Sequence, residues 1–251
     1  MRLRRLQVRS VERLTPAYVR VVLEGPELEG FESAAPDDHV KLFFPDAEGR
    51  LTLPELSPGG SPVLDEAARS RMRDFTPRRF DGASLTIDFA LHGAGVANAW
   101  ASTVKPGATL VVGGPRGSTL VPADFDWYLL AGDETALPAI ARRLEELPAT
   151  ARVTALIEVD GEADVQPLGG PPALTSRWLF RRGTPAGEAG LLARALQELE
   201  WPPGDGFVFA AGESGEMRSV REVLQQRGQR RDWSRVTGYW KRGVADFHEG
   251  H

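Results

Sequence analysis

The sequence predicts two domains, a small antiparallel β-barrel followed by an α/β domain built on a parallel sheet. Up to about residue 122, short segments of alternating apolar and polar residues are separated by turn-rich stretches, with little helical periodicity. That pattern is typical of a small barrel. From about residue 125 onward, apolar strand-like runs alternate with amphipathic stretches, which indicates a parallel sheet covered by helices. We therefore expect a β-domain at residues 1–122 and an α/β domain at residues 123–251.

The first half is expected to contain a series of short strands. The basic N-terminal stretch lacks the apolar run of a signal peptide, so we interpret it as the first strand. The Pro- and Gly-rich segment at residues 47–70 receives no assignment. Alternating polarity predicts further strands at residues 18–24, 39–45 and 84–92, and a short apolar run bounded by glycines predicts one at residues 109–112.

The second half is expected to alternate strands and helices. Apolar runs predict strands at residues 126–132, 152–159, 177–180 and 206–212. Amphipathic stretches predict helices at residues 136–147, 187–200 and 213–226. In a sheet of this kind, nucleotides bind where strands end and helices begin.

The composition excludes several kinds of chemistry. The 251 residues include no cysteine, so disulfides, thiol nucleophiles and cysteine-bound iron–sulfur clusters are excluded, and redox chemistry would need a bound cofactor. A formal net charge of -5 argues against a nucleic-acid partner. The four histidines show no metal-ligand spacing, so no protein-bound metal is expected. No apolar run has the length of a membrane span, and we expect a soluble, cytoplasmic protein.

A basic stretch at residues 71–80 surrounds the Phe75 ring and the Thr76 hydroxyl. The Arg73 guanidinium suits a phosphate group. The Phe75 ring can stack on a planar heterocycle, and the Thr76 hydroxyl can hydrogen-bond the edge of that heterocycle. Together these groups favour a flat, anionic cofactor. The alternative is a solvated basic strand at a sheet edge.

A glycine-rich turn follows the strand predicted at residues 84–92. His92, Gly95, Ala97 and Trp100 lie where a short helix would begin. Free backbone N–H groups at such a helix start suit a pyrophosphate. The alternative is a tight strand-to-helix turn without a ligand.

Two similar turns follow apolar strands in the second half. The first spans Gly132 to Thr135, where Thr135 is expected to cap the next helix, and the second contains Gly212 and Glu213. Two such turns on adjacent strand ends would face one nucleotide-binding crevice, although neither is a GxGxxG motif. The alternative is an ordinary connection between a strand and a helix.

The stretch at residues 238–243 combines two aromatic residues with Lys241 and Arg242. A cationic patch of this kind would attract an anionic substrate. The alternative is a terminal strand whose charges are merely solvated.

In their order along the chain, four of these stretches resemble the siderophore-interacting protein family. They are residues 73–76, 88–101, 132–138 and 238–243, and the resemblance extends over nearly the whole chain. Members of this family are ferric-siderophore reductases of the ferredoxin–NADP reductase superfamily. The resemblance implies an antiparallel Greek-key β-barrel that binds FAD, followed by a parallel-sheet α/β domain that binds NADPH or NADH.

The resemblance also implies roles for individual residues. Arg73 would pair with a FAD phosphate, Phe75 would lie against the flavin, and Thr76 would bond the flavin edge. The residues expected to form a second FAD segment are Asp88, His92, Gly95, Ala97 and Trp100. The residues expected to line the nicotinamide crevice are Gly132, Asp133, Glu134, Thr135, Gly212 and Glu213. Lys241 and Arg242 would receive the anionic ferric siderophore, and the reaction needs no catalytic acid or base.

Three positions depart from the family pattern. Phe75 stands where the family has Tyr, and Val96 stands where Pro is expected. Pro77 removes a backbone donor directly after the motif. These changes predict weaker FAD binding and loss of the flavin on purification.

The implied function is a reductase that passes electrons from NAD(P)H through FAD to a ferric siderophore and releases Fe(II). A flavin reductase with another acceptor and a non-enzymatic siderophore-binding protein are the alternatives. The choice of nucleotide stays open, because Glu158 and Asp160 would disfavour the 2′-phosphate of NADPH, whereas several arginines would favour it. These arginines are Arg142, Arg143, Arg177, Arg181 and Arg182. A monomer is expected.

Overall fold

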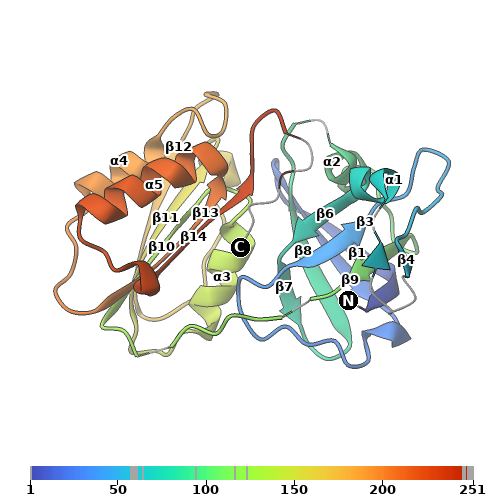
Figure 1. Ribbon diagram of the computed structural model, residues 1–251, viewed down its shortest axis with the longest axis horizontal. Helices are drawn as coiled ribbons and strands as arrows, with labels where there is room; N and C mark the ends of the chain where they lie inside the picture. Colours follow the sequence, from blue (N-terminus) through green and yellow to red (C-terminus); the bar gives the residue numbers. More distant parts are fainter. Residues whose placement is uncertain are drawn as a thin grey trace. The chain divides into compact units, whose positions relative to one another are not determined.

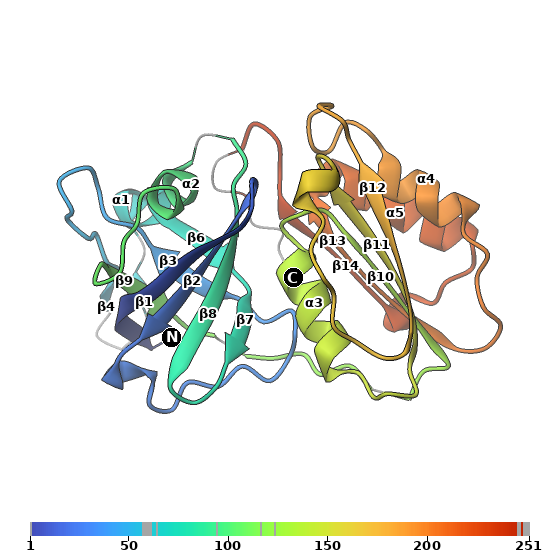
Figure 2. The same cartoon turned by 180° about the vertical axis from the view of Figure 1, so that it is seen from behind.

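The chain divides into two compact units, Met1–Val121 and Pro122–His251. The computed structural model describes residues 2–56, 62–63, 65–93, 95–115, 117–122, 124–244 and 247. Figures 1 and 2 show a first unit made mostly of strands and a second unit in which helices cover a sheet. Within these described ranges, no helix is long and apolar enough to cross a membrane. The same ranges contain no group of three or more His, Asp or Glu side chains placed to hold a metal ion.

A seven-stranded antiparallel sheet forms the first unit, in the order β6-β3-β9-β1-β2-β8-β7. β6 and β7 are its two outer strands, yet only Thr76 separates them in the chain. The sheet therefore curls until its two edges meet at Thr76, and the predicted antiparallel β-fold is confirmed as a half-barrel (Figure 1). Its strands are β1 (Leu3–Thr15), β2 (Tyr18–Glu24), β3 (Val40–Phe43), β6 (Met72–Phe75), β7 (Pro77–Phe80), β8 (Ser84–Ala90) and β9 (Thr109–Gly113).

Short elements complete the first unit. The Asp65 carboxylate accepts a hydrogen bond from the Ala68 N–H at 2.7 Å and so caps a short helix. That helix and a small hairpin lie in the segment that the sequence left unassigned. The elements are η1 (Pro26–Leu28), β4 (Glu55–Leu56), β5 (Pro62–Val63), α1 (Glu66–Ser70) and α2 (Val96–Ala101).

The first unit has an apolar core of its own. Leu6, Val21, Ile87 and Leu110, from four different strands, are fully buried in it. The alternation that predicted the strands is thus the alternation of buried and exposed side chains.

The second unit contains a five-stranded parallel sheet in the order β12-β11-β10-β13-β14. Every neighbouring pair in this sheet is parallel, which confirms the predicted α/β architecture. Its strands are β10 (Trp127–Gly132), β11 (Arg152–Val159), β12 (Ala173–Phe180), β13 (Gly206–Glu213) and β14 (Ser234–Trp240).

Helices cover both faces of this sheet. The helices α4 (Leu191–Glu198) and α5 (Ser214–Gln226) pack on the face that carries Leu129 and Val208 (Figure 2). The helix α3 (Leu137–Glu146) lies against the opposite face, because a methyl group added at Gly132 would come within 3.3 Å of Ile140 Cδ1. Two short turns of helix, η2 (Glu162–Asp164) and η3 (Arg231–Trp233), complete the unit.

Two predicted boundaries in the second unit are wrong. The helix expected at residues 187–200 spans only Leu191–Glu198, because Gly187 and Gly190 adopt positive φ angles of 78° and 60° before it. The strand expected at residues 177–180 begins earlier, at Ala173, which pairs with Arg152 of β11.

Candidate functional site

The two outer strands of the first unit meet in a basic seam. Thr76 lies at this seam and is only 8% exposed. Arg73, on β6, donates from Nη1 to the backbone oxygens of Ser70 at 3.1 Å and Met72 at 2.7 Å. Arg78, on β7, places its Nε 3.9 Å from a carboxylate oxygen of Asp88. The seam therefore carries a guanidinium on each strand, with one buried hydroxyl between the strands.

An aromatic cluster, formed by Phe44, Phe75, Phe89 and Trp100, adjoins the seam. The Phe75 ring centroid lies 4.5 Å from that of Phe89 and 6.3 Å from that of Phe44. Trp100, on α2, lies 5.6 Å from each of the Phe44 and Phe89 rings. The cluster thereby holds α2 against the strands that carry Phe75 and Phe89. The two stretches that were expected to bind FAD are thus brought together.

Asp88 contacts arginines of the neighbouring strands. Its side chain is buried and accepts hydrogen bonds from Arg20 Nε and Nη2, each at 2.7 Å. Arg20 lies directly opposite Asp88 on β2. Paired in this way, the Asp88 carboxylate anchors cations, and an anionic cofactor would not approach it.

The turn before α2 has room for a ligand. A methyl group placed on Gly95 would meet no atom within 4 Å. Asn98 donates from Nδ2 to the Gly93 oxygen at 2.6 Å, whereas its buried Oδ1 has no hydrogen-bond partner within the described part of the chain. His92 is exposed, and Ala97 packs against the core.

These residues fit FAD. The seam offers guanidinium groups for a phosphate and a hydroxyl for the edge of a heterocycle. The half-buried Phe75 ring can stack on a flat ring system. The orphaned Asn98 Oδ1 is an acceptor for one of the N–H or O–H donors of a flavin nucleotide, since buried polar atoms normally have a partner.

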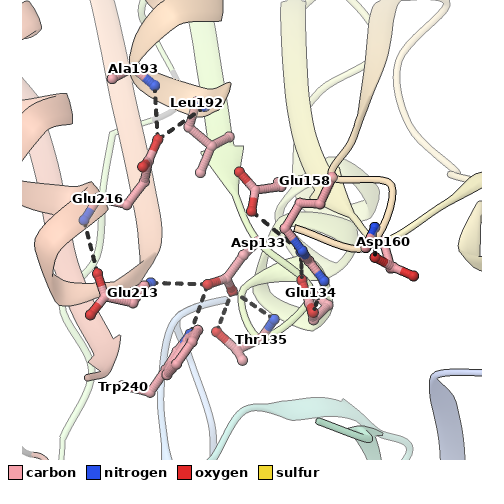
Figure 3. A network of polar contacts seen from close by, with 12 residues as sticks. Asp133, Glu134, Thr135, Glu158, Asp160, Leu192, Ala193, Glu213, Glu216 and Trp240 are labelled. Carbon is pink, nitrogen blue, oxygen red and sulfur yellow. Dashed lines mark hydrogen bonds and ion pairs between the residues drawn. The ribbon is translucent and has the colours of Figure 1, made fainter. Parts of the chain in front are cut away.

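In the second unit, Asp133 joins the ends of three strands (Figure 3). Its Oδ2 accepts hydrogen bonds from the Glu213 N–H at 3.0 Å and the Trp240 Nε1–H at 2.8 Å, where β13 and β14 end. Its Oδ1 accepts bonds from the Thr135 N–H at 2.8 Å and the Thr135 hydroxyl at 2.6 Å. The prediction that Thr135 caps α3 is wrong, because its hydroxyl donates to Asp133 within the same turn and Ala136 precedes the helix. The neighbouring order of β10 and β13 does place the Gly132 and Gly212 turns side by side.

Two further buried carboxylates hold the starts of helices. Glu213 Oε2 accepts hydrogen bonds from the N–H groups of Gly215 and Glu216 and caps α5. Glu216 Oε1 accepts bonds from the N–H groups of Leu192 and Ala193, each at 3.1 Å, at the start of α4. Both carboxylates therefore satisfy backbone donors that a helix start leaves unpaired.

A buried ion triad of Glu134, Glu158 and Arg181 lies where β10, β11 and β12 end (Figure 3). Arg181 Nη1 and Nη2 donate to the two carboxylate oxygens of Glu134, each at 2.6 Å. Arg181 Nη1 also lies 3.3 Å from Glu158 Oε1. Burial raises the pKa of the Glu158 carboxyl from 4.5 to about 7, although the charge of Arg181 acts in the opposite direction.

Because they belong to this triad, Glu158 and Arg181 are removed from the residues expected to select between NADPH and NADH. The side chains of Glu158 and Arg181 are only 2% and 7% exposed and face one another, so neither is placed to contact a bound nucleotide. Asp160 accepts a hydrogen bond from the Gly183 N–H at 2.9 Å. Arg182 remains exposed, 3.7 Å from Glu162.

Lys241 and Arg242 follow β14 and are both exposed. Arg242 forms an ion pair with Glu188. Its backbone N–H also donates to Glu213 Oε1 at 3.2 Å. The positive charge at this end of β14 is therefore partly offset, and the segment is tied to the end of β13.

The carboxylate network as a whole is not apparent from the sequence. Asp133, Glu134 and Glu213 are expected there as ligand contacts, whereas the roles of Arg181 and Glu216 are not predicted. The available signal was a charged residue at the end of several predicted buried strands, because a buried charge needs a partner.

The fold first defines a general class. A flavohemoglobin from Malassezia yamatoensis, solved with bound FAD and heme, superposes with a TM-score of 0.68 at 14% identity, over 95% of this chain and 60% of that chain. Phthalate dioxygenase reductase superposes with a TM-score of 0.61 at 14% identity, over 95% of this chain and 68% of that one. Likenesses at this level of identity show the shared ferredoxin reductase-like fold alone.

The chain belongs to the siderophore-interacting protein family, which confirms the resemblance drawn from the four motifs. A family model described as the siderophore-interacting FAD-binding domain matches residues 7–119, and one described as siderophore-interacting protein matches residues 125–243. NADPH-dependent ferric-chelate reductase of Escherichia coli is 35% identical over 245 residues, which cover 96% of this chain and 93% of that protein. Ferric vibriobactin reductase ViuB of Vibrio cholerae is 33% identical, over 92% and 87% of the two chains. A siderophore utilization protein from T. fusca has a TM-score of 0.93 at 43% identity, over 98% and 95% of the two chains.

Proposed function

We propose that the protein is a FAD-dependent ferric-siderophore reductase that takes its electrons from NADPH. The observation that supports this most directly is the match of both halves, in order, to the two models of one family. Two relatives point the same way, since one is named an NADPH-dependent ferric-chelate reductase and the other a ferric vibriobactin reductase. FAD, when bound, links a two-electron hydride donor to a one-electron ferric acceptor. Siderophore oxygen ligands prefer Fe(III), so the reduced iron leaves more readily.

We assign FAD to the first unit, proposed as a domain at residues 1–122. Arg73 holds a phosphate, Thr76 bonds the flavin edge, and Phe75 lies against the flavin ring. His92, Gly95, Ala97 and Trp100 form the second segment, in which Trp100 fixes α2 through the aromatic cluster. Asp88 acts indirectly, because it holds the arginine side chains of Arg20 and Arg78 in place.

We assign NADPH to the carboxyl ends of β10 and β13, in a domain proposed at residues 123–251. Ligands of open parallel sheets bind at this edge. Gly132, Glu134, Thr135 and Gly212 shape the crevice, and Asp133 and Glu213 tie its walls together through their hydrogen bonds to the backbone.

We assign the ferric siderophore to the segment of Lys241 and Arg242, which are exposed cations. A Lys241→Ala/Arg242→Ala variant should raise the KM for a catecholate ferric siderophore about fivefold at low salt, with less effect at high salt. An Arg230→Ala/Arg231→Ala variant removes the same charge from another exposed site of the second unit and serves as the control. An unchanged KM in the first variant would remove this assignment.

We also propose that the enzyme acts as a monomer in the cytoplasm. Each unit has its own buried apolar core, which supports folding without a partner subunit. Light scattering of the purified protein tests the monomer, and cell fractionation tests the location.

The reductase activity is tested in an anaerobic assay with purified protein, added FAD, NADPH or NADH, a ferric siderophore and a coloured Fe(II) trap. Protein-dependent trap colour, faster with NADPH, is the expected result. Nucleotide oxidation without trap colour would show a flavin reductase with another acceptor. Absence of both FAD uptake and nucleotide oxidation would leave a siderophore-binding protein.

A further inference from the structure

The ion triad contains more negative than positive charge. Glu134 and Glu158 share the single guanidinium of Arg181, and none of the three side chains is more than 8% exposed. They reach this point from the ends of three adjacent strands. A buried charge without a full counter-charge is costly, so one carboxyl of such a group tends to take up a proton.

The geometry identifies which carboxyl that is. Glu134 receives two hydrogen bonds of 2.6 Å from Arg181, in the fork-to-fork arrangement that suits an ionised carboxylate. Glu158 receives only a 3.3 Å contact from Nη1, an atom already bonded to Glu134. The second oxygen of Glu158 is buried and has no hydrogen-bond partner within the described residues. Glu158 is therefore the member that gains least from being charged.

The surroundings of Glu158 favour the neutral form further. Besides Glu134, which shares Arg181 Nη1 with it, the charged groups that face Glu158 are Arg181 after β12, Asp133 in the turn after β10, and Glu216 on α5. Two of these three groups are acids, which oppose a negative charge on Glu158. Burial and these two acids together hold the Glu158 pKa at about 7, against the attraction of Arg181.

We propose that Arg181 is the positioning residue of the Gly132–Thr135 turn, and that Glu158 controls how firmly Arg181 holds this turn by gaining or losing one proton. With Glu158 neutral, the charge of Arg181 is balanced by Glu134 alone, and the turn is fixed. With Glu158 ionised, the guanidinium is shared between two carboxylates and a net negative charge appears beside the turn. The turn then loosens and repels an anionic ligand.

This inference rests on the proposed function only where it concerns NADPH. If the turn binds the nucleotide, affinity falls as the pH rises through neutrality. A unit charge at roughly 10 Å in a partly screened environment changes the dissociation constant about three- to tenfold. The effect on the turn itself is independent of any ligand.

The first experiment measures hydrogen exchange of the turn in the FAD-loaded protein. The probes are two backbone N–H groups. The Thr135 N–H donates to Asp133 Oδ1 at 2.8 Å, and the Ala136 N–H donates to the backbone oxygen of Asp133 at 3.0 Å. Between pH 6 and pH 8, their protection factors should fall about fivefold in the wild type and stay constant in Glu158→Gln. Glu162→Gln, an exposed acid of the same unit, should behave as the wild type. Equal pH profiles in the wild type and Glu158→Gln would overturn the proposal.

A second variant tests Arg181 itself. Arg181→Lys keeps the charge but loses the two-pronged contact, so exchange at Thr135 and Ala136 should accelerate at every pH. Wild-type protection in this variant would overturn the positioning role, even if Glu158→Gln behaves as expected.

The second experiment measures the dissociation constant of NADP⁺ for the FAD-loaded protein from pH 6 to pH 8. The ratio of the wild-type dissociation constant to that of Glu158→Gln should increase about three- to tenfold from pH 6 to pH 8. Titration of the ligand phosphate is common to both proteins and cancels in this comparison. Absence of NADP⁺ binding together with a pH-dependent turn would refute the assigned nucleotide site and still support the control of the turn by Glu158. If the dissociation constants of the two proteins differ by the same factor at every pH, the link between Glu158 and the nucleotide would be overturned.

Discussion

Replacing Glu158 by Gln should stabilise the second unit above pH 7 and change its stability little near pH 4. In the folded protein the Glu158 pKa is about 7, against an ordinary value of 4.5. Its contribution to stability is therefore fully present below pH 4.5 and is lost as the pH rises to about 7. Gln resembles the protonated acid in shape and does not titrate, so the variant does not suffer this loss.

The size of the effect follows from the pKa difference. Each pKa unit corresponds to about 1.4 kcal/mol, so the difference between 4.5 and about 7 amounts to about 3 kcal/mol of unfolding free energy. The 2% exposure of the Glu158 side chain leaves little screening by solvent to reduce this value. The carboxyls of Glu134 and Glu216 also have raised pKa values because they are buried. Glu216 acts on Glu158 directly and Glu134 acts on it through Arg181, so the difference between the variant and the wild type contains this coupling as well as the titration of Glu158 itself.

Urea unfolding at several pH values, followed by tryptophan fluorescence, measures this difference. Five of the six tryptophans lie in the second unit, so the signal reports mainly on its unfolding. Glu162→Gln is the control, since that side chain is 72% exposed. A stability gain in Glu158→Gln of the same size at pH 5 and pH 8 would show that Glu158 does not titrate in this range, and the reasoning would be refuted.

Three further outcomes are expected. Arg73→Ala should weaken FAD binding about tenfold, measured by flavin fluorescence, whereas the exposed Arg9→Ala should not. Trp100→Ala should destabilise the first unit by about 2 kcal/mol in urea unfolding, because the half-buried Trp100 contacts the buried rings of Phe44 and Phe89. Gly206→Ala should lower the unfolding free energy by about 3 kcal/mol, since its methyl group would lie 2.0 Å from the Trp127 ring. Gly161→Ala, where no atom lies within 4 Å, should differ little from the wild type in the same measurement.

The strands that the sequence predicted correctly are those with one clear pattern of burial. In β2, three buried apolar residues, Val19, Val21 and Leu23, alternate with less buried ones, and β13 is buried throughout. The strands that were predicted too short or not predicted at all lie at sheet edges. The first half of β12 is largely exposed, and β14 is half-buried at nearly every position, so neither shows a period of two.

The candidate site was predictable as a set of motifs but not as a network. Glu134 and Arg181 are 47 residues apart in the chain, and their contact depends on the strand order β12-β11-β10. A sequence pattern shows that a strand ends in a charge, but it does not show which other strand end supplies the counter-charge. For the same reason, Asp88 was interpreted as a ligand contact, although the register of β2 and β8 places Arg20 directly opposite it.

The two Gly–acid turns of the second unit look alike in sequence but differ in what their carboxylates do. Glu213 occupies the first backbone donors of α5, and Glu216 occupies those of α4. At each of these helix starts, two backbone donors are therefore unavailable to a phosphate. The acid of the first turn, Asp133, bonds instead to Thr135 and to the ends of β13 and β14, and α3 begins without a side-chain cap. Since an anion at a parallel sheet depends on unpaired backbone donors, the turn at Gly132–Thr135 is the better candidate for the nucleotide. The control that Arg181 and Glu158 exert on this turn then acts where the ligand binds.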